Sequence, residues 1–208
     1  VAITPRLRGL IASMGDEAAR LYCLAMQAYS EGDAPMAAAL DDLDDRLDSL
    51  HRDYIAEIFV AHDEEQLTLQ EGVQLALIGR YYERIGDHAV NIAQSALRLI
   101  ALRSSITPDP EIEDMARRAR RMLSDALDAF IRADGSLGRE VCKADDAVDA
   151  LHNSLFRILL THMMADARTI NPALELLLVS RNLERVADLA TNIGEDAVYL
   201  AEGKQIKH

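Results

Sequence analysis

The chain has 208 residues, half of them hydrophobic and only 4% aromatic, with no tryptophan. This length suffices for one large domain or two small ones, and the hydrophobic content excludes an intrinsically disordered chain. The formal net charge of −13 disfavours nucleic acid and anionic lipid as partners, because their phosphates would be repelled. No apolar run approaches the roughly 18 residues that span a bilayer, so we expect no membrane insertion.

Turn-forming residues divide the chain into six segments with the apolar spacing of helices. The breaks lie at residues 32–35, 61–65, 133–136 and 171–172, and the last is interpreted as an Asn171 cap followed by Pro172 at the first helical position. Between breaks, apolar residues recur about every 3.6 positions, as in Leu43, Leu47 and Leu50. No segment alternates with the period of two typical of strands. The sequence therefore predicts an all-α protein of six helices.

The second half of the chain repeats the polar pattern of the first half 101 residues later. YYERIGDHAVNIAQ begins at Tyr81, and NLERVADLATNIGE begins at Asn182. In the same register His51 falls on His152 and Met14 falls on Met115, without a gap. We therefore interpret the chain as two homologous halves, 1–104 and 105–208, which meet near residues 104–110. Each half is predicted to be an antiparallel three-helix bundle, and the two bundles are arranged in tandem.

The repeated pattern places polar residues on one face of the last helix of each half. At about 100° per residue they lie within roughly a third of the circumference, opposite apolar positions such as Ile85 and Val186. An ordinary solvated face is one interpretation, but Glu and Asp at i and i+4 repel each other and both halves retain the pair, which favours a binding site. The residues are Arg80, Glu83, Arg84, Asp87 and Asn91, with the repeats Arg181, Glu184, Arg185, Asp188 and Asn192.

The second predicted helix of each half adds further acids. Five aspartates stand between positions 41 and 48, and Asp45 and Asp48 lie clear of the apolar stripe of their helix. If the second and third helices are antiparallel neighbours, these two carboxylates can approach Glu83 and Asp87. Converging carboxylates require a cation, and oxygen ligands suit Mg²⁺, Mn²⁺ or Fe. Arg84 and its repeat would then orient the carboxylates.

Two alternatives compete with this metal site. Asp48-x-x-His51 and Asp149-x-x-His152 imitate the ligand pairs of di-iron bundles, so a di-iron carboxylate oxidase or metal-storage protein is the first alternative. Such bundles need acids in the core, whereas the core-facing positions here are Ile, Val and Ala, and half-buried histidines with satisfied hydrogen bonds are expected instead. The second alternative is an acidic helical scaffold that binds basic partners without metal. No phosphate loop, nucleophile elbow or HExxH motif is present, so no enzyme activity is predicted.

Two copies of E-R-[IV]-x-D-x-x-x-N-I, together with residues 181–200, resemble the PhoU family of phosphate-transport regulators. The resemblance implies two three-helix bundles that bind Fe, Mn, Mg or Zn ions through E/D-x-x-x-D motifs. It also implies a cytoplasmic, non-enzymatic negative regulator of the Pho regulon, often a homodimer. Such a protein couples the ATPase of the phosphate-specific ABC transporter to a sensor histidine kinase.

The resemblance also assigns residues. The family commonly has His after the motif aspartate, as at His88, but Leu189 occupies the repeat position, so the two sites are expected to differ. The implied metal ligands are Glu83, Asp87, Glu184 and Asp188, supported by Asp45, Asp48, Asp146 and Asp149. The residues expected to orient them are Arg84, Asn91, Arg185 and Asn192.

Overall fold

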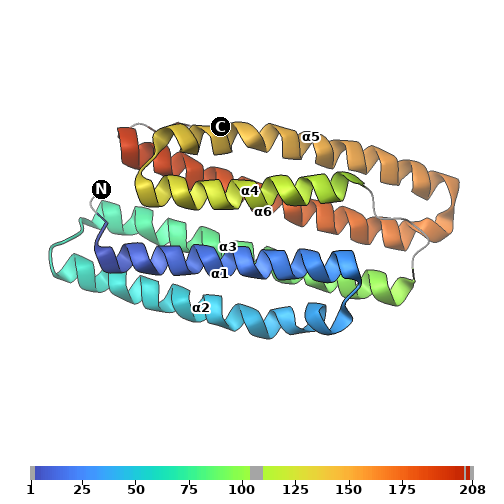
Figure 1. The fold of residues 1–208 in the computed structure, drawn as a ribbon, viewed down its shortest axis with the longest axis horizontal. Coiled ribbons are helices and arrows are strands. Elements are labelled where there is room, and N and C mark those ends of the chain that lie inside the picture. The colour runs from blue at the N-terminus through green and yellow to red at the C-terminus, as the bar shows by residue number, and fades with distance from the viewer. Residues whose placement is uncertain (1–2, 104–109, 204, 207–208) are drawn as a thin grey trace.

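The computed structural model describes residues 3–103, 110–203 and 205–206, and every regular element within these ranges is a helix. The predicted all-α class with six long helices is confirmed (Figure 1). Among the described residues, none of the helices is long and apolar enough to cross a bilayer. The helices are α1 Pro5–Glu31, α2 Ala34–Asp63, α3 Leu69–Leu102, α4 Pro110–Arg132, α5 Gly135–Ala165 and α6 Ile170–Glu202, with a short 3₁₀ helix, η1, at Ala167–Thr169 before α6.

Repeat-related residues cap equivalent helices. The side chain of Asp33 accepts a hydrogen bond from the Met36 amide at the start of α2, at 3.0 Å. Asp134 accepts one from the Leu137 amide at the start of α5, also at 3.0 Å. A carboxylate at this position satisfies an amide that has no partner within the helix. The first turns of α2 and α5 are therefore built in the same way.

The start of α6 differs from the prediction. The cap residue is Thr169, so the helix already includes Asn171, and Pro172 lies inside the first turn. Proline is tolerated there because the first-turn amides have no intrahelical acceptor to lose. The predicted meeting point of the halves, near residues 104–110, falls mostly on residues 104–109, which lie outside the described residues.

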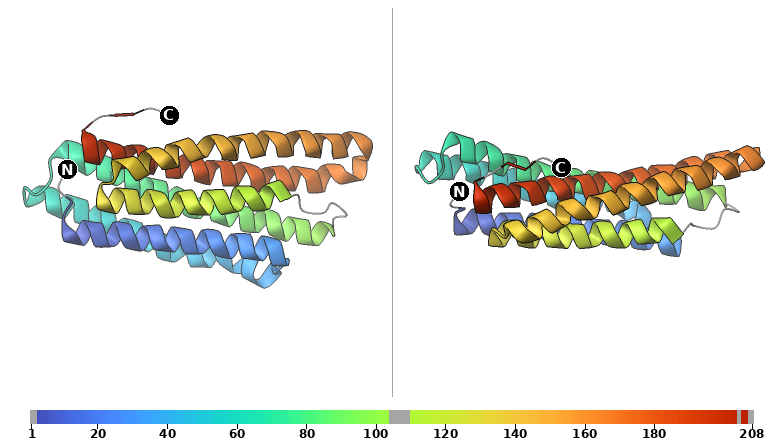
Figure 2. Two further views of the ribbon diagram at one scale, coloured as in Figure 1. Left: turned by 45° about the horizontal axis from the view of Figure 1, so that its top comes forward. Right: turned by 90° about the horizontal axis from the view of Figure 1, so that it is seen from above.

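The helices form four layers. Figure 1 shows α2 along one edge, then α1 with α3, then α4 with α6, and finally α5 along the other edge. Within each half the three helices contact one another, and the halves meet through α3 with α6 and α1 with α4. The α2–α3 connection and the α5–α6 connection lie at opposite ends of the long axis (Figures 1 and 2).

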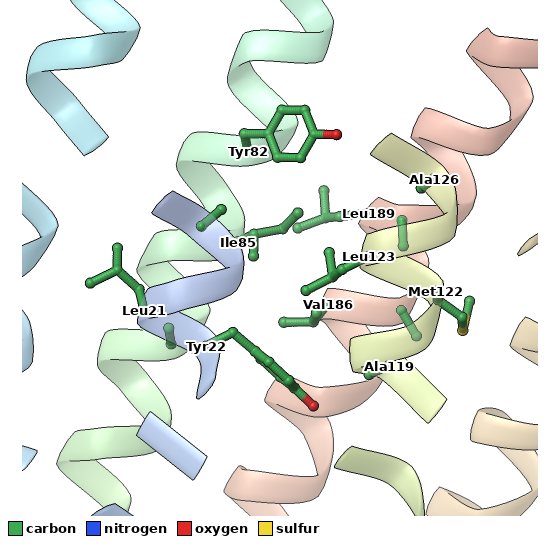
Figure 3. Close-up of a cluster of buried hydrophobic side chains, with 14 of the residues drawn as sticks. Leu21, Tyr22, Tyr82, Ile85, Ala119, Met122, Leu123, Ala126, Val186 and Leu189 are labelled. Carbon is green, nitrogen blue, oxygen red and sulfur yellow. The ribbon is translucent and has the colours of Figure 1, made fainter. Parts of the chain in front are cut away.

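One apolar core passes through both halves. Side chains of α1, α3, α4 and α6 meet at the centre of the molecule, as Figure 3 shows. The predicted apolar face of α3, represented by Ile85 and Ile92, is fully buried, and so is Val186 on α6. The halves are therefore repeats in sequence but form one packing unit. The buried residues labelled in Figure 3 are Leu21, Tyr22, Tyr82, Ile85, Ala119, Met122, Leu123, Ala126, Val186 and Leu189.

Two buried tyrosines in this core have different polar environments. The Tyr22 hydroxyl of α1 donates a 2.6 Å hydrogen bond to the carbonyl of Ala116 on α4, which joins the two halves. The Tyr82 hydroxyl of α3 is equally buried, but it has no hydrogen-bond partner within the part of the chain that the structure describes. Only the first hydroxyl therefore recovers the hydrogen bond that it loses when it leaves water.

We expect Tyr22→Phe to lower the free energy of unfolding by about 1 kcal/mol, because it removes a buried hydrogen bond. Tyr82→Phe should leave stability unchanged or raise it slightly, because it removes a buried hydroxyl that has no partner. Urea denaturation of both variants beside the wild type measures the difference. Equal losses in the two variants would contradict this account of the core.

Candidate metal-binding site

The long helices α3 and α6 run antiparallel across the boundary between the halves. His88 Nδ1 of α3 lies 2.9 Å from Asn182 Oδ1 of α6, and Arg98 Nε lies 2.8 Å from Glu175 Oε1. An amide oxygen can only accept, so Nδ1 of His88 carries the proton in this bond. These contacts hold the two acidic motifs, in the middle of α3 and of α6, in fixed positions relative to each other.

The first acidic cluster forms where α2 packs against α3. Glu83 and Asp87 of α3 lie close enough to Asp44 of α2 for their charges to act on it, and the charge of Glu83 also acts on Asp48. Asp44 is only 8% exposed. A Cβ atom added to Gly86 would lie 2.5 Å from Asp44 Oδ1, so this glycine permits the carboxylate to rest against the α3 backbone. We call these four acids the first cluster.

Each aspartate of the first cluster holds its proton more strongly than usual. Burial, and then the charges of Asp48, Asp87 and Glu83, raise the pKa of Asp44 to about 7. Burial and neighbouring carboxylates also raise the pKa of Asp48 and of Asp87, although Arg80 and Arg84 oppose the shift at Asp87. Like charges drawn together in a partly buried place raise one another's pKa, and a bound cation reverses this effect.

One buried oxygen of the first cluster has no hydrogen-bond partner within residues 3–103, 110–203 and 205–206. Asp44 Oδ1 is buried and makes no hydrogen bond to any residue that the structure describes. The same is true of Nε2 of His51, one helical turn beyond Asp48. Buried polar atoms are nearly always satisfied, so orphaned atoms beside clustered carboxylates indicate a place for a ligand. The donor set of the first cluster therefore fits a cation.

The second acidic cluster forms at the repeat-equivalent contact of α5 with α6. Asp145, Asp149 and Asp188 each offer a carboxylate oxygen, and these oxygens lie within 4.8 Å of one another. Burial, and then the charges of Glu184 and Asp149, raise the pKa of Asp188, whereas Arg185 lowers it. This spacing would allow one cation to contact all three carboxylates. We call these four acids, including Glu184, the second cluster.

Histidine takes a different position in the two halves. His152 Nδ1 lies 2.6 Å from Ser180 Oγ, and its Nε2 lies 3.7 Å from Glu184, at the edge of the second cluster. In the first half Gly79 occupies the position of Ser180, and His51 packs directly against it. Both histidines are half-buried, as the sequence predicted, but only His152 has the expected hydrogen bond, because Nε2 of His51 has no partner among the described residues. Only His152 is held toward the motif glutamate by a second side chain.

The structure places Asp44 and Asp145, rather than Asp45 and Asp146, against the third helix of each half. Asp45 and Asp146 are exposed, whereas Asp145 is only 5% exposed. Asp44 and Asp48 are one turn apart, about 40° around the helix, and therefore face the same neighbour. Asp44 and Asp48 have the same i, i+4 spacing as Glu83 and Asp87, and this spacing was the feature of the sequence that could have identified Asp44.

The residues predicted to orient the carboxylates are more remote. Arg84 and Arg185 act on Asp87 and Asp188 through their charge, and within residues 3–103 and 110–203 neither forms an ion pair. Arg80, in contrast, donates directly to Glu83. Asn91 donates to Asn182 Oδ1 at 3.3 Å, while Asn192 is half-buried on α6.

A family model for the PhoU domain matches the chain twice, over residues 11–96 and 112–197. The chain belongs to the PhoU family. The similarity to PhoU relatives extends over most of the chain. It is 32% identical over 197 residues to the phosphate-specific transport system accessory protein PhoU homolog of Clostridium acetobutylicum, covering 93% of this chain and 90% of that protein. It is 35% identical over 187 residues to the Caulobacter vibrioides homolog of the same name, covering 88% and 80%.

Solved PhoU structures share this fold. The crystal structure of PhoU from Pseudomonas aeruginosa superposes with a TM-score of 0.90 at 28% identity, covering 96% of this chain and 97% of that one. The regulatory protein PhoU from Streptococcus pneumoniae superposes with a TM-score of 0.89 at 22% identity, covering 98% and 97%. Both bundles and their relative arrangement are thus a property of the PhoU fold.

Position 88 and its repeat differ because they face different neighbours across the α3–α6 contact. His88 bonds to Asn182, while Leu189 is buried in the shared core, where Figure 3 shows it beside Val186 and Leu123. The polar residue in the first half therefore joins the halves through a hydrogen bond, and the apolar residue in the second half joins them through packing.

In chelator-treated protein we expect Asp44→Asn to stabilise the fold in a pH-dependent manner. The folded pKa is about 7. The unfolded value is near the usual ~4, so the wild type loses stability as pH rises between these values. The variant should gain roughly 2 kcal/mol over the wild type by pH ~8 and much less at pH ~4.5.

Urea denaturation at the two pH values measures this gain. The control is Asp45→Asn, which removes an exposed aspartate one position away and should show no such pH dependence. A gain that is the same at both pH values, or that is equal in the two variants, would contradict the description of Asp44 as a buried, cluster-repelled carboxylate.

Proposed function

We propose that this chain is a metal-binding, non-enzymatic regulator of phosphate uptake. Membership of the PhoU family supports the regulatory part, because the similar proteins are named accessory proteins of phosphate-specific transport systems. The metal-binding part rests on the two repeat-related carboxylate clusters, above all on the buried Asp44, whose Oδ1 has no hydrogen-bond partner in the part of the chain that the structure describes. In this role it acts in the cytoplasm, as a homodimer, and couples the ATPase of the phosphate ABC transporter to a sensor histidine kinase.

The four acids of the first cluster would hold one metal site, and the four acids of the second cluster would hold the other. Oxygen donors favour hard ions such as Mg²⁺, Mn²⁺ or Fe, and a histidine beside Glu184 extends the choice in the second cluster to Zn²⁺. A bound cation supplies positive charge where carboxylates repel one another. Asp44 and Asp48 would then tie α2 to α3, and Asp145 and Asp149 would tie α5 to α6.

Metal binding at these places would affect the surface that the protein presents. Without metal, repulsion among the acids loosens the contact between the second and third helices of each half. With metal, the same acids join the helices, and the net charge of the face becomes less negative. A regulator that must be recognised by partner proteins would thereby gain a defined surface in its loaded state.

A di-iron oxidase needs its acids in the centre of the bundle. The centre of this molecule is occupied by apolar side chains such as Ile85, Val186 and Leu123 (Figure 3). The carboxylates lie instead at the contacts of α2 with α3 and of α5 with α6, and one of them, Asp87, is exposed. The position of the acids thus favours the regulator over the oxidase.

We expect elemental analysis of protein purified without a metal-affinity tag to find bound metal. The double variant Asp44→Asn/Asp145→Asn should lose most of that metal, because each substitution removes a buried oxygen ligand. The matched control, Asp45→Asn/Asp146→Asn, removes two neighbouring exposed aspartates of the same helices and should retain wild-type metal content. Glu83→Gln/Glu184→Gln tests the motif glutamates in the same assay.

Two results would count against the metal site. The first is an absence of metal together with a melting temperature that Mn²⁺ and Fe²⁺ leave unchanged, which would favour an acidic scaffold without metal. The second is an equal loss of metal in both aspartate variants. The regulatory part is tested separately in a host that lacks its own PhoU. There the chain should restore repression of a phosphate-starvation reporter in phosphate-rich medium.

A further inference from the structure

An apolar groove lies at the tip of the α2–α3 hairpin, away from the first cluster. Its volume is about 250 Å³. Phe59, Leu69 and Val73 are 66%, 72% and 54% exposed, although their side chains are fully apolar. A monomer rarely leaves large apolar side chains contiguous and open to water unless something binds them. The lining residues are Ile55, Ile58, Phe59, His62, Leu69, Gly72, Val73 and Ala76.

The shape of the groove follows from the order of large and small residues. Leu69, Val73 and Leu77 repeat every four positions along α3 and form one ridge of exposed side chains. Phe59 stands opposite, on α2. Gly72 leaves the floor between them open because it has no side chain, and a Cβ atom there would lie 3.3 Å from Ile58 Cγ2. A groove between two antiparallel helices accepts the apolar stripe of a third helix.

The charge around the groove is predominantly negative. The sequence from Asp53 to Gly79 contains six acidic residues and neither lysine nor arginine. Arg6 of α1 pairs with one of the six, Glu57, at 3.0 Å. A second copy of this acidic chain would bring like charge to the same place, which disfavours self-association through this groove. The remaining acids are Asp53, Asp63, Glu64, Glu65 and Glu71.

We propose that this groove binds an amphipathic, basic helix of a partner protein. The apolar stripe of that helix would pack against Phe59, Leu69 and Val73, and its lysines or arginines would face the acidic rim at positions 63–65 and 71. Apolar contact supplies most of the affinity in such grooves, while charge selects the partner and speeds association. The proposal does not depend on metal at either acidic cluster, because the groove shares no residue with them.

The other hairpin tip provides an internal comparison. Leu160, Ile170, Leu174 and Leu178 occupy the positions of Phe59, Leu69, Val73 and Leu77 and are exposed as well. The segment 154–180, however, contains two arginines, one aspartate and one glutamate. Its charges are balanced and partly paired, as in Arg168 with Asp166 at 2.8 Å. The second tip is thus apolar without an acidic rim, and it lies at the opposite end of the molecule (Figure 2).

The proposal can be tested with a synthetic helical probe and the full chain. The probe is a fluorescein-labelled peptide of about four helical turns with leucine at i, i+3, i+4 and i+7 and lysine elsewhere. Fluorescence anisotropy should show saturable binding that weakens as salt is raised. Phe59→Ser/Val73→Ser should weaken it at least tenfold, by about 1.4 kcal/mol or more. The matched control, Leu160→Ser/Leu174→Ser, should change the affinity less than about twofold.

Further comparisons separate apolar contact from charge. Glu64→Gln/Glu65→Gln should weaken binding and reduce its dependence on salt. A peptide with serine in place of leucine, or glutamate in place of lysine, should bind at least about tenfold more weakly. The serine variants replace exposed side chains, so their melting temperatures should match that of the wild type and show that the fold is intact.

Several results would overturn the proposal. These are absence of probe binding, equal binding of the serine-substituted peptide, and equal losses in the variants of the two tips. If the probe does not bind and sedimentation shows that Phe59→Ser/Val73→Ser abolishes a dimer, the groove is instead a contact between copies. If the same variant abolishes binding to anionic vesicles while the probe does not bind, the groove is a lipid contact.

Discussion

The rotation of α3 and α6 about their own axes is the constraint on which the site depends. Each of these helices buries one apolar face, including Ile85 or Val186, in a core shared by both halves. The opposite faces must then meet α2 or α5, and they carry the motif carboxylates. A change in the core that turned α3 by one residue, about 100°, would carry Glu83 and Asp87 away from Asp44 and Asp48. The packing of the core therefore also fixes the geometry of the carboxylates.

The first cluster is an exception to the rule that buried polar groups are hydrogen-bonded. Asp44 is buried beside three other acids, its pKa is raised to about 7, and one of its oxygens has no partner among the described residues. A chain selected only for stability would place an apolar or neutral residue there. A bound cation would offset the free-energy cost of burying these carboxylates, because each of them would be attracted to the shared positive charge. Gly86, which gives the carboxylate room against the α3 backbone, fits the same purpose.

The two halves retain their acids and differ in the residues around them. Gly79 and Ser180 set different environments for His51 and His152, and His88 and Leu189 join the halves in different ways. The hairpin tips differ as well, since both are apolar but only the α2–α3 tip is surrounded by acids. A duplicated bundle can in this way keep one chemistry in two copies while each end of the molecule presents a different surface. The two ends then have the means to recognise different partners.

The sequence by itself determined the helical class, the positions of most helix ends, and the repeat with its polar face. Each of these follows from local periodicity, from the turn-forming residues between the helices, as at residues 32–35, and from the spacing of Glu83 and Asp87, which do not depend on distant contacts. The similarity to PhoU proteins was also visible in the two short motifs. The early start of α6 could not be predicted from the sequence, because Pro172 is as compatible with the third helical position as with the first.

Only the tertiary structure decided which aspartate of each acidic run faces the third helix. Asp44 borders the apolar stripe of α2 and Asp45 lies clear of it, but the stripe alone does not say which carboxylate meets another helix, and the position of α3 selects Asp44. The tertiary structure also decided that the halves share one core. In the sequence Phe59 and Val73 have the ordinary spacing of apolar helix residues, and only the fold shows that they line an open groove. The reason is the same in each case. Helical periodicity gives the direction of a side chain relative to its own axis, and only the neighbouring helix decides whether that direction is covered.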